Sequence, residues 1–190
     1  AEQALPENLR ASTFHPPTLD MLERFGAATE LIRMGLKAPR LQYRDRAGWK
    51  VGFDFGDIAD LTQHPFRVQC EQYRLNGVLV RWLQAHGGEV RFGQRVAGLE
   101  QDGTGVTALV ESQGGATTRL RGSYLVGADG GRSAVREALG IRLEGFTWPE
   151  RFLVVSTPYP FERHFDDLCE VSYFADPEEW FFLLRVSGVW

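Results

Sequence analysis

The chain has only two cysteines among its 190 residues, Cys70 and Cys169, and they lie far apart without a metal or redox spacing. This scarcity excludes a disulfide-stapled scaffold and predicts two reduced thiols in a cytoplasmic protein. Long apolar runs and signal-peptide patterns are absent, so we expect no membrane partner. The net charge is −4 and no run of one sign occurs, which argues against a nucleic-acid partner. The four histidines are scattered, so no metal site is predicted.

Several catalytic and cofactor motifs are also missing. The string from Gly103 to Ala108 fits Gly-x-Gly-x-x-Ala by its letters, but a β-branched alternating run follows instead of a helix. We therefore interpret it as a hairpin turn and not as a dinucleotide fingerprint. No nucleophile elbow and no Ser, His and Asp order is present. We assign no residue of this chain as a catalytic acid, base or nucleophile.

Composition and length describe an ordinary globular chain. Apolar residues make up 43% and charged residues 24% of the sequence, which suits one large domain or two small ones. The sequence begins at Ala1 and not at Met. From this beginning we expect the chain to be a piece of something longer.

Residues 124–139 carry the most informative pattern. The apolar run 124–126 predicts a short buried strand, residues 127–131 a turn, and residues 133–139 a helix that ends at Gly140. Glycines let a ligand approach the backbone closely, and Asp129 follows the predicted strand, where α/β sheets hold their ligands. Ser133 is the candidate N-cap. From spacing alone, the same pattern equally fits a tight connection that Asp129 merely caps.

The string Gly-Ala-Asp-Gly-Gly-Arg-Ser-Ala-Val-Arg, residues 127–136, resembles the internal Asp-Gly fingerprint of the FAD-dependent aromatic hydroxylases. These are the single-component, class A flavoprotein monooxygenases, such as the para-hydroxybenzoate, phenol and 3-(3-hydroxyphenyl)propionate hydroxylases. In that family the turn serves both FAD and NAD(P)H binding. The resemblance implies cofactor-binding roles for Asp129, Gly130, Ser133 and Arg136.

Three further cofactor contacts are implied by the same resemblance. Arg10 precedes a predicted helix as the family's FAD pyrophosphate arginine does, and a guanidinium fork suits a diphosphate. Gln69 is the best match to a glutamine that contacts FAD at a helix start, although the register leaves Gln72 open. Val96 matches a position whose backbone contacts adenine.

Periodicity predicts the other elements. Thr18 is a plausible N-cap for a helix that ends at Gly26, and the phenylalanines at 53, 55 and 66 are expected in the core. The predicted elements are a hairpin within 40–68 that turns at 44–48, a helix over 67–86, a strand at 90–92, an antiparallel meander over 95–100, 106–111 and 117–121, and aromatic strands at 152–155, 171–174 and 180–184.

These elements predict a mixed α/β (α+β) fold. We expect a partial FAD/NAD(P)-binding Rossmann-like domain with an antiparallel meander, plus part of a β-sheet substrate domain. The FAD-binding domain is assigned to 1–39 and 67–144, and the substrate sheet to 40–66 and 145–190. Because the family's N-terminal Gly-x-Gly-x-x-Gly unit and C-terminal part are missing, we expect these residues alone to bind FAD weakly or not at all. Their free sheet edges favour a homodimer or complementary segments.

The activity implied by the resemblance is hydroxylation of a small phenolic substrate, with FAD as cofactor and NAD(P)H and O2 as co-substrates. Two alternatives stay open. The first is another FAD oxidoreductase on the same scaffold, such as an epoxidase, a halogenase or a reductase, although no Trp-x-Trp-x-Ile-Pro halogenase string occurs. The second is a truncated, non-catalytic scaffold that self-associates.

Overall fold

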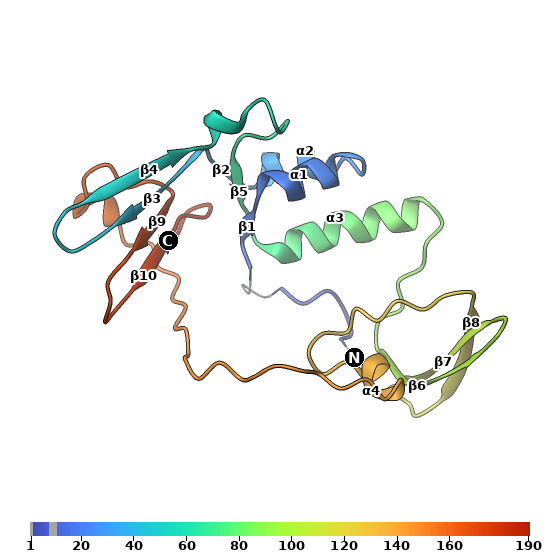
Figure 1. The fold of residues 1–190 in the computed structure, drawn as a ribbon. Helices are drawn as coiled ribbons and strands as arrows, with labels where there is room; N and C mark the ends of the chain where they lie inside the picture. Colours follow the sequence, from blue (N-terminus) through green and yellow to red (C-terminus); the bar gives the residue numbers. More distant parts are fainter. Residues whose placement is uncertain (1, 8–10) are drawn as a thin grey trace. The chain divides into compact units, whose positions relative to one another are not determined.

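A computed structural model of the protein describes residues 2–7 and 11–190 (Figure 1). The chain divides into two compact units, which we describe separately. The larger unit comprises Leu5–Glu89 and Leu153–Trp190, and the smaller unit comprises Ala1–Ala4 and Val90–Phe152. Helices, antiparallel sheets and one parallel strand pair confirm the predicted mixed α/β class. The domain boundaries drawn from the sequence stay a prediction.

One half of the larger unit packs three helices against a three-stranded antiparallel sheet of order β1-β5-β2 (Figure 1). Leu19 and Leu31 are fully buried, and they share one core with Val68 of the sheet and Leu75 of the third helix. The helical spacing of these apolar residues therefore forms the core. The elements are β1 (Thr13–Phe14), α1 (Pro16–Glu23), α2 (Ala27–Met34), β2 (Leu36–Ala38), β5 (Arg67–Gln69) and α3 (Gln72–Ala85).

The predicted N-cap of the first helix is wrong by three residues. Pro16 occupies the first position of α1 and His15 is its N-cap, so Thr18 lies inside the helix. Proline suits that first position because its φ is already helical and it lacks an N–H that would go unpaired. Gly26 has a φ of +65° and separates α1 from α2, a helix that the sequence pattern did not predict.

The helix predicted over 67–86 begins at Gln72 instead. Residues 67–69 form β5 because they pair with β1 on one side and β2 on the other. The backbone N–H groups of Cys70 and Gln72 then donate to the carbonyls of Ser12 and Ala11. Sheet pairing therefore takes the residues that periodicity alone assigns to the helix.

The other half of the larger unit is a four-stranded sheet of order β10-β9-β3-β4. The hairpin predicted around 44–48 is confirmed, with Arg44 opposite Lys50. The strand predictions at 171–174 and 180–184 are confirmed as well, and β9 lies parallel to β3. The elements are β3 (Arg40–Arg44), β4 (Lys50–Asp54), η1 (Phe55–Ile58), η2 (Phe161–Arg163), β9 (Val171–Phe174) and β10 (Phe181–Leu184).

This sheet contains one buried polar pair. Gln42 Nε2 donates to Ser172 Oγ at 2.8 Å, and Ser172 Oγ donates to the Cys169 carbonyl at 3.0 Å. The prediction that Phe53 belongs to the core is wrong, since Phe53 is 52% exposed. Phe53 lies on β4, an edge strand, where its ring has an edge-on contact to Tyr43.

The smaller unit is the predicted meander followed by one short helix. Its strands are β6 (Gln94–Asp102), β7 (Gly105–Ser112) and β8 (Thr117–Gly122), and its helix is α4 (Ala134–Ala138). Residues 103–104 form the β6–β7 turn, which confirms that this string is no dinucleotide fingerprint.

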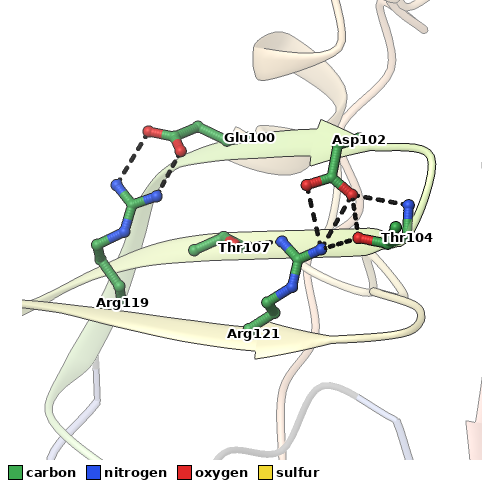
Figure 2. Close-up of polar contacts among 6 residues, drawn as sticks. All are labelled: Glu100, Asp102, Thr104, Thr107, Arg119 and Arg121. Atoms are coloured by element: carbon green, nitrogen blue, oxygen red, sulfur yellow. Dashed lines mark hydrogen bonds and ion pairs between the residues drawn. The ribbon is translucent and has the colours of Figure 1, made fainter.

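Charged side chains cross one face of the meander (Figure 2). Arg119 binds the Glu100 carboxylate with both terminal nitrogens, at 3.1 and 2.5 Å. Arg121 Nη2 donates to both oxygens of Asp102, at 2.9 and 3.1 Å. Asp102 also accepts the Thr104 amide, and these contacts, the Arg121 hydrogen bond foremost, lower the pKa of the Asp102 carboxyl to about 2. The network ties β6 to β8 across β7.

Three predicted strands are wrong, at 90–92, 124–126 and 152–155. None of the three segments pairs as a strand with any described residue, and Phe92 lies in a turn. Tyr124, Val126 and Leu153 are 92%, 87% and 89% exposed. A strand requires a neighbour to receive its backbone hydrogen bonds, and hydrophobicity alone does not supply one.

Candidate functional site

The predicted ligand turn lies between an extended segment and α4. Gly127 comes so close to Val135 that an added Cβ would lie 2.9 Å from its side chain. Gly130 has a φ of +81°, a conformation that favours glycine. The predicted helix and its stop are confirmed, because α4 spans Ala134–Ala138 and Gly140 follows with a φ of +68°.

The Asp129 carboxylate organises this turn. Its Oδ1 accepts the Ser133 hydroxyl at 2.5 Å and its Oδ2 accepts the Val135 amide at 3.2 Å. The predicted N-cap is confirmed, since Ser133 Oγ accepts the Arg136 amide at 3.0 Å. The Ser133 hydrogen bond, aided by backbone amides, lowers the pKa of the Asp129 carboxyl. Asp129 therefore presents an ionised carboxylate, and it caps the connection as the simpler interpretation proposed.

Four of the predicted cofactor residues meet in this turn. Arg136 Nη1 reaches back to the carbonyl of Gly131 at 2.8 Å, so its guanidinium braces the loop. The amides of Gly130 and Gly131 donate to no other described residue, and open space lies where their side chains would stand.

These features fit a dinucleotide. A carboxylate oxygen has two lone pairs, so Asp129 retains acceptor capacity for a ligand hydroxyl. The two free glycine amides can donate to a phosphate or carbonyl oxygen without steric hindrance. The turn thus has both the acceptor and the donors that the polar parts of FAD require.

A cavity of about 490 Å³ lies beside the turn in the smaller unit. Its wall combines Leu125 and Val135 with apolar and polar residues of the β6–β7 hairpin, such as Leu99 and Thr104. Leu125 therefore faces the meander although its segment is not a strand. No residue that lines this cavity was predicted as a site residue. The cavity forms where Leu125 and Val135 meet the β6–β7 hairpin, which is separate from them in the sequence.

Gln69 is in a different setting from the one expected. It lies on β5 in the larger unit and is fully buried, and its Oε1 accepts the Thr13 hydroxyl at 2.6 Å. Its Nε2 is buried without a partner among the described residues. Gln72, the alternative, is the exposed first residue of α3. A role of Gln69 in FAD binding stays a prediction, and the exposed Gln72 side chain is the more accessible of the two.

The last two predicted contacts are less defined. Val96 lies on β6, an edge strand, at a bulge where the register with β7 shifts between Val96 and Gly98. An edge strand has backbone groups that face away from its single neighbour, as a backbone contact to adenine requires. The adenine contact itself stays a prediction. Arg10 lies outside the described residues.

An aromatic wall, which the sequence did not resolve residue by residue, covers one face of the four-stranded sheet. Tyr43 and Tyr173 face each other across the β3–β9 pair, and their rings stack at 4.9 Å. Phe182 adjoins Tyr173 at 6.3 Å. Arg67 Nη1 donates to the Tyr173 hydroxyl at 3.4 Å, and its Nε is buried without a partner among the described residues. The alternation of residues along each strand could have shown which aromatic side chains share a face. It could not show that β3 pairs with β9, and this pairing brings Tyr43 and Tyr173 together.

Metal and membrane features complete the description. Among the described residues no group of three His, Cys, Asp or Glu side chains is placed to hold a metal ion. Both cysteines are buried and unpaired. In the described part of the chain, every helix is too short or too polar to cross a membrane.

Comparison with known proteins identifies the family. The model of the FAD binding domain family matches residues 2–181. The para-nitrophenol 4-monooxygenase of Pseudomonas sp. (strain WBC-3) is 30% identical over 194 residues, which cover 100% of this chain and 47% of that protein. A flavin-dependent monooxygenase of Mycobacteroides abscessus is 46% identical over 156 residues, 76% of this chain and 32% of that relative.

A solved structure agrees with these relatives. The p-nitrophenol 4-monooxygenase PnpA of Pseudomonas putida DLL-E4 superposes with a TM-score of 0.90 at 27% identity, over 100% of this chain and 48% of that one. The chain thus spans about half the length of this structure and of the Pseudomonas relative. With a family match over nearly every residue and a turn that fits a dinucleotide, this chain belongs to the FAD binding domain family.

Proposed function

We propose that the protein containing this chain is an FAD-dependent monooxygenase that hydroxylates a small phenolic substrate, with NAD(P)H as reductant and O2 as oxidant. The observation that carries this proposal is the family match over residues 2–181. Relatives named as para-nitrophenol and 3-(3-hydroxy-phenyl)propionate hydroxylating enzymes support the aromatic substrate class. Bound FAD supplies the redox and oxygen chemistry, and the protein supplies binding and orientation.

In this proposal the Asp129 turn holds the cofactor. The ionised carboxylate accepts a hydroxyl of the cofactor, and the amides of Gly130 and Gly131 donate to its oxygens. Ser133 and Arg136 keep the carboxylate and the loop in place through the contacts at 2.5 and 2.8 Å. Arg136 binds the loop carbonyl and pairs with Glu137 of α4 at 3.5 Å, and it makes no ion pair with Asp129.

The aromatic wall suits the proposed substrate. The stacked rings of Tyr43 and Tyr173 offer an apolar face for another ring, since aromatic pairs favour stacked and edge-on contacts. Arg67 adds a cation beside the Tyr173 hydroxyl, which favours a phenol in its phenolate form. This assignment depends only on residues of the larger unit.

Flavin binding tests the cofactor half of the proposal. In the protein that contains these residues, Asp129→Asn should raise the Kd for FAD about tenfold or more, because a hydrogen bond to a charged group contributes roughly 1.5–3 kcal/mol. Glu144→Gln, an exposed carboxylate in the same unit, is the matched control and should leave the Kd unchanged. Flavin absorbance and fluorescence titrations give both values. Equal Kd values for the two variants would contradict the role of Asp129.

Substrate-stimulated NAD(P)H oxidation tests the reaction. Phenols should accelerate it and yield hydroxylated products, whereas alkenes should not. Epoxide formation would favour the alternative of another FAD oxidoreductase on this scaffold, and comparison of NADH with NADPH would identify the reductant. We place the reaction in the cytoplasm, because the two buried cysteines are unpaired and the nicotinamide cofactors are supplied there.

A second function is favoured by the exposed apolar segments. Val126 and Leu153 are almost fully exposed in extended backbone without strand partners among the described residues. Such segments support pairing with complementary segments or with a second copy. Gel filtration with an absorbance spectrum distinguishes the cases. A colourless dimer of the 190-residue chain would support the scaffold function, and a yellow monomer would contradict both that function and the expectation of weak FAD binding.

A further inference from the structure

A separate pocket lies on the other face of the four-stranded sheet. The registers place Lys50, Arg44, Phe174 and Phe181 in one row across all four strands, because Arg44 pairs with both Lys50 and Phe174, and Phe174 pairs with Phe181. Tyr43 and Tyr173 occupy the adjacent row, so strand alternation sends their side chains to the opposite face. The row therefore lies on the face away from the aromatic wall.

Three phenylalanine rings give this pocket an apolar wall. The Phe174 and Phe181 rings stack at 4.3 Å and 9°, and the Phe165 ring meets Phe174 at 4.9 Å. Phe174 is buried, whereas Phe181 remains 44% exposed and presents a face to solvent. The pocket is open to solvent on one side and has a volume of about 300 Å³, which is at the lower end for small-molecule sites and suits a single ring with its substituent.

The guanidinium of Arg44 lies over two of these rings. Its Cζ is 5.6 Å from the Phe165 centroid and 5.9 Å from the Phe174 centroid, within the range of a cation–π contact. Arg44 Nη1 donates to the Asp166 carbonyl at 3.0 Å. No carboxylate of the described residues lies within ion-pair distance of Arg44. An arginine has five N–H donors, so most of its donors remain available.

The carboxylates around the pocket are already engaged. Asp176 pairs with Arg46 at 2.5 Å and accepts two backbone amides of its own turn. Asp45 accepts the Trp49 amide at 2.8 Å. Asp167, near the other end of the row, pairs with Lys50 at 2.6 Å, and that hydrogen bond is the main cause of the lowered pKa of the Asp167 carboxyl. Arg44 is thus the lining arginine without an ion pair among the described residues, and its charge acts on Asp167 only at longer range, as a minor cause of that lowered pKa.

We propose that this pocket binds a small aromatic anion, an arene carboxylate or phenolate. The ring packs among Phe165, Phe174 and Phe181, and the anionic group accepts hydrogen bonds from Arg44. An apolar wall with one unpaired guanidinium distinguishes such an anion from a neutral ring and from an aromatic amine. The proposal does not depend on the proposed monooxygenase function, since every residue it uses lies on the face away from the aromatic wall.

Matched probes test the ligand class. Benzoate, benzamide and benzylamine share one ring and differ in charge, so saturation-transfer NMR and calorimetry on the protein containing this chain compare them directly. We expect benzoate to bind at least tenfold more tightly than benzamide, and benzylamine to show no binding. Equal affinity for the three probes, or no binding of benzoate at millimolar concentration, would overturn the proposal.

Matched variants test the position. Arg44→Gln should weaken benzoate binding about tenfold or more and leave benzamide unchanged, since a hydrogen bond to a charged group contributes roughly 1.5–3 kcal/mol. Arg81→Gln, on α3 of the same unit and paired with Glu30 at 2.8 Å, does not line this pocket and should keep benzoate affinity within about twofold. Arg44→Lys keeps the positive charge. Its circular dichroism spectrum shows whether the variant folds, and its affinity for benzoate is measured on the same sample.

Tyr43→Ala separates this pocket from the aromatic wall. Its side chain points to the opposite face, so benzoate binding should persist in this variant. If Tyr43→Ala abolishes benzoate binding while Arg44→Gln does not, the anion binds the aromatic wall and the pocket assignment is wrong. Failure of FAD binding or of NAD(P)H oxidation bears on the proposed function alone and leaves this result unaffected.

Discussion

Two parts of the smaller unit have similar apolar patterns but different structures. The meander β6–β7–β8 forms a sheet with continuous pairing and two arginine–carboxylate contacts across its face (Figure 2). Segment 124–126 is equally apolar, yet it forms no strand, and its residues Tyr124 and Val126 are exposed. Each meander strand follows its partner within a few residues, whereas 124–126 has no partner among the described residues. A strand pattern therefore becomes a strand only when a neighbour is within reach.

Hydrogen exchange should show the largest difference between these parts. Amides of β7, paired on both sides, should exchange roughly a thousandfold or more slowly than those of 124–128, since opening a stable sheet costs a large part of a typical 5–15 kcal/mol unfolding free energy. The measurement is residue-resolved exchange on the 190-residue chain. Comparable protection in 124–126 would show that these residues do pair. Protection gained there in a longer protein would identify a complementary strand.

Equivalent truncations in the two parts give the next largest difference. Val110 on β7 is buried, whereas Val126 is 87% exposed. Val110→Ala should lower the free energy of unfolding by about 1.5–3 kcal/mol, the value of a buried valine side chain. Val126→Ala should change it by less than about 0.5 kcal/mol. Urea unfolding measures both, and equal losses would mean that 126 is buried in solution.

The cap of α4 tests how the turn is held beside its unpaired segment. Ser133→Ala removes both the N-cap to Arg136 and the hydroxyl donor to Asp129, and should cost about 1 kcal/mol of unfolding free energy. Ser123→Ala, at an exposed serine just before the unpaired segment, is the control and should have little effect. The same pair can be compared for FAD affinity. A loss of affinity with Ser123→Ala alone would contradict the site assignment.

The smallest effect concerns the pH dependence of the meander. The pKa of the Asp102 carboxyl falls from 3.8 to about 2 on folding, chiefly through its hydrogen bond from Arg121. Its contribution to stability is therefore nearly complete above about pH 5 and is lost as the pH falls through about 2. Asp102→Asn should remove that part of the pH dependence of the urea midpoint, and the Glu144→Gln control should keep it. An unchanged profile in Asp102→Asn would show that other carboxylates dominate.

The sequence predicted those elements whose partners are near in the chain. The hairpin at 40–54, the meander and the Ser133 cap each close within about twenty residues, so local pattern and turn chemistry identified them. The helix prediction for residues 67–69 is wrong because these residues form β5. The partners of β5 are β1 and β2, which lie up to 56 residues away in the sequence. Gln69 became a buried sheet residue for the same reason.

The sequence by itself determined the turn at Asp129. Glycines, a carboxylate and a capping serine within ten residues interact locally, and their resemblance to a known fingerprint needed no tertiary contact. Tertiary structure alone decided the two faces of the four-stranded sheet. The β3–β9 register joins residues 130 positions apart, so it pairs Gln42 with Ser172, stacks Tyr43 on Tyr173 and places Arg44 beside Phe174. Such long-range pairing requires the long segment between the two strands to bring its ends together. The local periodicity of the sequence contains no information about this step.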